Sequence, residues 1–100
     1  MIRTRYTRCV KYDALPGYEL IAEGLQALAA GERTVPAVLV LIGAARLRAV
    51  GMDVPGADVT DPEHELYAML AAEDADSAHG RYNALIRQLV SFERAAECAA

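Results

Sequence analysis

The stretch VPAVLVLIGAA, residues 35–45, is the most apolar part of this chain and contains no charged or hydrogen-bonding side chain. It follows Thr34, a residue type that caps helix N-termini, and its Pro36 is tolerated in a first helical turn. We therefore predict a helix over 34–50 that ends near Gly51. This helix is the centre from which the rest of the fold can be worked out.

The predicted helix is apolar on two opposite sides when its residues are projected at about 100° each. A helix of this kind must be buried on both sides. It lies either at the centre of a bundle or between two subunits. One side carries Val38, Leu39, Ile42 and Ala45, and the other carries Ala37, Val40, Leu41, Ala44 and Leu47.

Three further helices are predicted from their boundaries over 16–30, 61–74 and 77–98. Pro16 and Gly31 are typical of a helix start and a helix end, and Thr60-Asp61-Pro62 is a typical start. The short link before Thr34 indicates an antiparallel hairpin. A Pro-Gly pair makes 51–61 the inter-hairpin loop. The expected fold is all-α: one helical domain over 1–100, with four helices in two antiparallel hairpins packed as a small bundle.

The composition fits a single soluble globular domain, with 54% hydrophobic residues and a net charge of -4. The apolar run is shorter than the roughly 20 residues that cross a bilayer, so no membrane segment is expected. No apolar stretch of the secretory kind follows the basic start of the chain. A cytoplasmic location is the resulting expectation.

Charge is unevenly distributed along the chain. Residues 1–11 carry Arg3, Arg5, Arg8 and Lys11 and no acid, whereas 49–80 carry eight acids and no Lys or Arg. The interpretation given more weight is that these opposite charges match within a chain or between subunits. The alternative is that the basic end contacts nucleic acid and the acidic segment docks a partner.

Residues 1–12 form a basic N-terminal arm whose conformation the pattern leaves open. Its β-branched and aromatic residues alternate with polar ones, which favours an extended strand. However, Ile2, Tyr6 and Val10 also fit one helical stripe. In the strand interpretation, Arg3, Arg5 and Thr7 share a face, and a strand followed by two helices is the order of a ribbon-helix-helix repressor. The acidic net charge and the irregular link over 10–15 count against that architecture.

Two further binding motifs do not fit this sequence. A helix-turn-helix is excluded because its second helix would present Val38 to Ile42 to DNA bases. A calcium loop starting at Asp74 is excluded because His79 stands where the turn glycine is needed and Leu85 stands where a bidentate Glu is needed.

The chemically reactive residues form no recognisable motif. His64 or His79 could combine with Glu65, Glu73 or Asp76 in a metal or acid-base site, but neither HExxH nor paired ExxH spacing is present. Ser77 and Ser91 lack a nucleophile motif. Cys9 and Cys98 are expected to be reduced thiols. We therefore expect no catalytic residues, no metal and no cofactor.

The sequence thus predicts a small, non-catalytic helical module for protein interaction or regulation that acts as a homodimer, with another protein as the second candidate partner. The expected interface is Val38, Leu39, Val40, Leu41, Ile42 and Leu47. The alternative is a dimeric ribbon-helix-helix-like DNA-binding regulator that uses Arg3, Arg5 and Thr7, with its acidic C-terminal half bound to a partner protein.

Overall fold

A computed structural model describes residues 12–99 of the chain, and this part is all-helical. The described residues contain no strand. The all-α prediction is confirmed, and most predicted helix ends lie within two residues of the observed ones. The helices are α2 (Tyr18–Ala29), α3 (Val35–Ile42), α4 (Ala44–Ala49), α5 (Pro62–Glu73) and α6 (Ala78–Ala99).

The helix boundaries follow from local side-chain and backbone chemistry. Thr34 caps α3, since its hydroxyl accepts a hydrogen bond from the Ala37 amide at 3.2 Å. Asp61 caps α5 in the same way through the amide of His64. Beyond α2 and α4 the chain turns at Gly31 and Gly51, which have φ of 77° and 96°. Glycine is favoured there because side chains with a Cβ rarely adopt positive φ.

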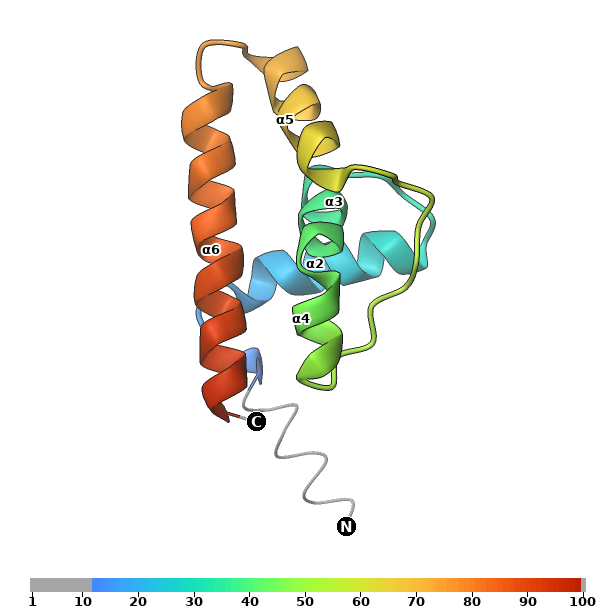
Figure 1. Cartoon of the computed structure of the whole chain (residues 1–100), viewed down its shortest axis with the longest axis vertical. Helices are drawn as coiled ribbons and strands as arrows, with labels where there is room; N and C mark the ends of the chain where they lie inside the picture. Colours follow the sequence, from blue (N-terminus) through green and yellow to red (C-terminus); the bar gives the residue numbers. More distant parts are fainter. Residues whose placement is uncertain (1–11, 100) are drawn as a thin grey trace.

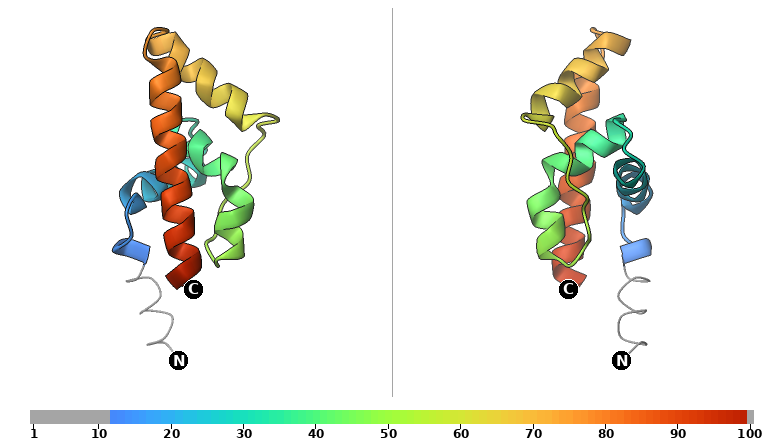
Figure 2. Two further views of the ribbon diagram at one scale, coloured as in Figure 1. Left: turned by 60° about the vertical axis from the view of Figure 1, so that its left-hand side comes forward. Right: turned by 90° about the vertical axis from the view of Figure 1, so that its right-hand side faces the viewer.

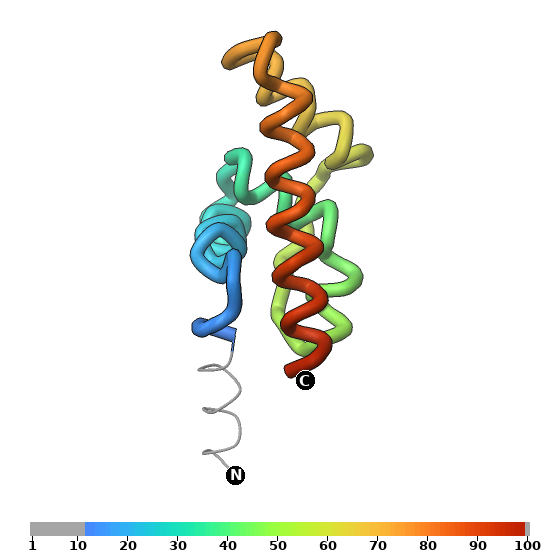
Figure 3. The backbone as a smooth tube through the Cα atoms, turned by 90° about the vertical axis from the view of Figure 1, so that its left-hand side faces the viewer, coloured from blue at the N-terminus to red at the C-terminus, as the bar shows by residue number. Residues whose placement is uncertain are grey.

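The longest helix, α6, forms one side of the molecule, and α3 and α4 follow each other beside it (Figure 1). In the same view α2 runs across the other helices. In Figure 3 helix α2 is seen nearly end-on. The predicted neighbours are in contact, α2 with α3 and α5 with α6, but α5 also packs against α3. The first pair crosses steeply, however, whereas the sequence suggested that its helices run side by side.

The short helix α3 is the centre of the hydrophobic core. Val38, Leu39 and Val40 are all 0% exposed, and α2, α5 and α6 all contact this helix. Each fully buried aliphatic side chain contributes roughly 1.5–3 kcal/mol. The chain's own helices therefore cover α3 on both sides, and its two-sided apolarity does not require a second subunit.

The predicted single helix over 34–50 is broken at Gly43, which separates α3 from α4. A side chain at Gly43 would overlap the carboxylate of Glu93 and would come within 2.9 Å of the Leu89 side chain. The backbone of the break thus lies directly against α6. Sequence periodicity gave no sign of this break, because the apolar pattern continues through it.

A second glycine, Gly24, allows α2 to cross α3 closely. A Cβ at this position would meet the backbone carbonyl of Pro36 and would lie 2.6 Å from a methyl of Val40. Gly24 is itself buried inside α2. The missing side chain is therefore what permits the close crossing of these two helices.

The segment between α4 and α5 is the loop that the sequence predicted over 51–61. It runs back beside α4 toward the start of α5 (Figure 2). Two arginines hold it: Arg48 donates to the carbonyl of Val54 at 2.8 Å, and Arg33 donates to the carbonyl of Asp58 at 3.2 Å. The Val54 side chain is buried in the core. This loop is thus fixed at two points, to α4 through Arg48 and to the link between α2 and α3 through Arg33.

Within residues 12–99, none of the helices has the length and apolar character needed to cross a membrane. The basic arm lies almost wholly outside the described residues. The strand and helix interpretations of that arm therefore both stay predictions.

Substitution of two glycines by alanine should separate the effect of close packing from that of helix propensity. We expect Gly24→Ala to destabilise the protein by about 1–3 kcal/mol, because the added methyl overlaps α3. Gly80→Ala is the matched control: nothing lies within 4 Å of a Cβ at that helical position, so we expect a gain of up to about 1 kcal/mol. Urea denaturation measures both, and equal effects would contradict the close crossing.

Candidate functional site

A broad depression lies over α5 and the end of the loop before it. We call it the α5 hollow. Its volume is about 580 Å³. Its lining combines apolar side chains with carboxylates and one histidine: Asp58, Val59, Thr60, Asp61, His64, Glu65, Ala68, Met69 and Ala72.

The apolar floor of this hollow exists because α5 cannot bury all of its apolar residues. Seven consecutive apolar residues, LYAMLAA at 66–72, go all the way round the helix. Leu66 and Leu70 are 0% exposed and face the core. Ala68 and Ala72 are exposed and Met69 is half-buried. The outer side of α5 is therefore apolar, where a surface helix ordinarily carries polar residues.

A smaller cavity of about 250 Å³ adjoins the hollow and shares Asp58 and Val59 with it. Apolar side chains from α2 and α3 line it, among them Leu28, Val38 and Leu41. The two depressions together extend from the end of α2 to Ala72 near the end of α5. They meet at the loop, and apolar and polar side chains line both of them.

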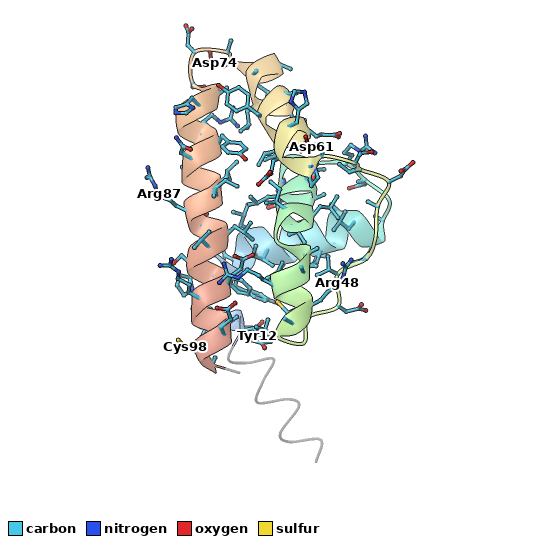
Figure 4. The ribbon with its side chains drawn as sticks, in the orientation of Figure 1. Tyr12, Arg48, Asp61, Asp74, Arg87 and Cys98 are labelled. Atoms are coloured by element: carbon cyan, nitrogen blue, oxygen red, sulfur yellow. The ribbon has the colours of Figure 1, made fainter. Side chains whose placement is uncertain are left out.

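The edge of this surface is acidic. Asp58, Asp61 and Glu65 line the hollow, and Figure 4 shows Asp61 at the start of α5. Arg33 is the one arginine in the lining of the two depressions. Its guanidinium forms an ion pair with Glu65 at 3.2 Å. Its charge is therefore already matched, and the edge keeps an excess of negative charge.

The expected interface residues lie mostly elsewhere. Val38, Leu39, Val40 and Leu47 are 0% exposed within the single chain, so they present almost no surface to a partner. Leu41 and Ile42 are half-buried, and Leu41 lines the smaller cavity. Of the six, Leu41 is thus the residue best placed to touch a bound molecule.

The histidines and the thiol are placed apart from one another. His64 lies at the start of α5, whereas His79 lies at the start of α6 and is 3.2 Å from the side chain of Asn83. Among residues 12–99, no three His, Cys, Asp or Glu side chains are grouped as a metal ion would need. Cys98 is exposed on α6 as a free thiol, and Cys9 lies outside the described residues.

A charge cluster of one arginine and two glutamates joins α4 to α6. Arg46 makes two 3.0 Å hydrogen bonds to the carboxylate of Glu97, and it also pairs with Glu93 at 3.0 Å. Glu93 is 3% exposed, beside Gly43. Burial raises the pKa of Glu93 despite the attraction of Arg46, whereas the hydrogen bond from Arg46 lowers the pKa of Glu97. This cluster lines neither depression, and its role is to hold α4 against α6.

The sequence showed the acidic edge but missed the apolar floor. The excess of acids over 49–80 was evident from the charge distribution. The signal for the floor was the unbroken run over 66–72, since a seven-residue apolar run on a helix near the surface leaves apolar side chains exposed. Only the fold shows which of them face the loop.

Two variants of the charge cluster should change the pH dependence of stability in opposite ways. Ionised Glu93 costs stability above its raised pKa, so we expect Glu93→Gln to gain stability relative to the unchanged chain as pH rises from 4.5 toward neutrality. Glu97 contributes stability above 4.5 that is lost as pH falls through its lowered pKa. Glu97→Gln should therefore lose stability at neutral pH and match the unchanged chain in acid. Melting temperatures from acid below the lowered pKa of Glu97 up to neutral pH measure both variants. The same sign at neutral pH for both would contradict the assignment.

Comparisons with known proteins identify no relative of this chain. No protein-family model matches the chain, and neither a curated protein nor a solved structure matches it. Its function must therefore be argued from its own residues and their geometry.

Proposed function

We propose that this chain is a non-catalytic protein-interaction module whose binding surface is the α5 hollow. The observation that carries the proposal is the solvent-facing apolar side of α5 beside an acidic edge. The partner that fits such a surface is a basic segment with regularly spaced apolar side chains. The apolar side chains would cover the floor and the cations would meet Asp58 and Asp61, since Glu65 is already paired with Arg33.

The geometry favours a peptide segment over a small molecule. Small-molecule sites enclose most of the ligand in a concave pocket, whereas this surface is spread over a helix and the loop beside it. Amphipathic helices and other short segments bind such surfaces through a few apolar anchors. Opposite charge around the edge sets orientation and speeds association.

The geometry of the hollow also supports a function in binding rather than in catalysis. His64 is the one histidine in the lining of the hollow, and the acids near it lie at its exposed edge. Acid-base catalysis requires a titratable group held by partners in a fixed position next to the reacting atoms. The hollow offers contact area and charge, which is what recognition requires.

Binding of labelled peptides tests the proposal. We expect basic amphipathic peptides to bind the full chain, acidic amphipathic ones not to bind, and the affinity to fall with salt. Ala68→Lys puts a cation on the floor of the hollow and should weaken binding about tenfold or more, a loss of about 1.4 kcal/mol. Fluorescence anisotropy measures the affinity.

The matched control is Ala84→Lys, which changes an exposed alanine of α6 that does not line the hollow. It should leave the affinity unchanged. Equal loss in both variants, or no binding of any peptide class, would contradict the proposed surface.

A second candidate is the DNA-binding regulator, which is favoured by the cations of the basic arm. Residues Arg3, Arg5 and Thr7 lie outside the described residues. We expect this function, if present, to give salt-dependent DNA binding that Arg3→Ala and Arg5→Ala weaken. An absence of DNA binding at low salt would remove it.

A further inference from the structure

We infer that the smaller cavity, the one that adjoins the α5 hollow, is a pocket for a single aromatic side chain of the bound segment. This inference rests on the proposed function, because it names the side chain that would fix the partner on that same surface. Three features of the cavity support it: its size, its buried floor and its fixed wall.

The cavity is large enough for one aromatic ring and smaller than most small-molecule sites. Its volume is about 250 Å³. A protein cavity of about 150 Å³ binds benzene, whereas sites for drug-sized ligands measure about 300–1,000 Å³. Tryptophan and tyrosine are also among the residue types that most often anchor a protein partner in a pocket. One aromatic side chain therefore fits this space.

The cavity exists because small residues border it where larger ones would fill it. Gly31 and Gly56 line it, and nothing lies within 4 Å of a Cβ placed at either glycine. Ala37 and Ala57 line it as well. The φ of 77° at Gly31 favours glycine there. Gly56 does not have a positive φ, so its backbone does not demand a glycine, and the space beside it is not explained by the turn.

The floor of the cavity is apolar and its rim is open to solvent. Val38 is fully buried, Leu28 is nearly so, and Leu41 is half-buried. The exposed residues of the rim come from the link after α2 and from the loop before α5: Gly31, Glu32, Arg33, Gly56, Ala57 and Asp58. A ring that enters from solvent would therefore move from water onto apolar side chains, which is the main favourable contribution to most protein association.

The loop wall of the cavity, residues 56–57, is held in place on both sides. Arg48 donates to the carbonyl of Val54 before it, and Arg33 donates to the carbonyl of Asp58 after it. A wall that is fixed before binding loses little conformational freedom when a side chain enters. The cavity is therefore formed in the free chain, and a partner need not build it.

The rim of the cavity favours cations beside the aromatic side chain. The carboxylates of Glu32 and Asp58 are exposed at the rim, and neither forms an ion pair within residues 12–99. Arg33, the cation of the rim, is already paired with Glu65 at 3.2 Å. Opposite charge next to an anchor sets its orientation. An aromatic residue flanked by lysine or arginine thus matches both the cavity and the basic partner proposed above.

Substitutions in a peptide and in the cavity wall together test the inference. The probe is a labelled lysine–leucine peptide whose leucines recur every three and four residues, with each leucine replaced in turn by tryptophan or by alanine. By fluorescence anisotropy on the full chain, we expect one position at which tryptophan binds about tenfold or more tightly than alanine. Ala57→Leu and Gly56→Leu narrow the cavity and should remove that difference. Ala84→Leu, at an exposed position of α6, should keep it.

The outcomes separate this inference from the proposed function. Loss of the tryptophan preference in the two narrowed variants, while both melt cooperatively, supports the pocket. A preference that both narrowed variants retain, or the lack of any position that favours tryptophan, overturns the pocket. If Ala68→Lys still weakens binding in that case, the α5 hollow remains the binding surface. Absence of binding by every peptide rejects both the pocket and the surface.

Discussion

Close packing around α3 is the constraint on which the rest of this structure depends. A helix of eight residues with no polar side chain can be placed only where neighbours cover it on every side. Two glycines make this possible: Gly24 lets α2 cross it, and Gly43 lets the α3–α4 break lie against α6. A side chain at either position would push a neighbouring helix away from the core. The paths of α2 and α6 are thus set by where α3 needs cover.

The cover of α3 also explains why α5 has a surplus of apolar residues. Leu66 and Leu70, one turn apart, are enough to pack α5 onto the core, and both are fully buried. Met69 and Ala71 are partly buried and pack against the edge of the core. The ring of Tyr67 lies 5.7 Å from that of Tyr82 on α6. Ala68 and Ala72 stay exposed, and together with Met69 they line the hollow.

The helices could be predicted from the sequence because their boundaries depend on short-range chemistry. Thr34 and Asp61 cap helices wherever the chain later places them, and glycines at positive φ end them locally. The break at Gly43 and the crossing at Gly24 depend on residues far away, Glu93 and Pro36, so no local pattern indicated them. For the same reason the sequence suggested a subunit interface on Val38 to Val40, where the fold supplies its own cover.

Some of the acids at the edge of the hollow stabilise the fold, and others have no such role. Asp61 caps α5, and Glu63 and Glu65 lie in its first turn, where the helix dipole favours negative charge. Glu73, near the other end, is paired with Arg81 at 2.8 Å. Such local roles explain most acids of this region without a partner.

Met69 and Val59 have no capping or pairing role, although Met69 packs partly against the core. Exposed alanines such as Ala68 and Ala72 suit any helix because alanine has the highest helix propensity. Met69 has a flexible, polarisable side chain that adapts to varied contacts, and it lies half-buried in the hollow, as Val59 does. Neither residue belongs to the fully buried core. Met69 and Val59 lie beside carboxylates whose roles in the helix are already explained. Binding of a partner segment is therefore proposed as a simpler explanation of this surface than a role in the fold.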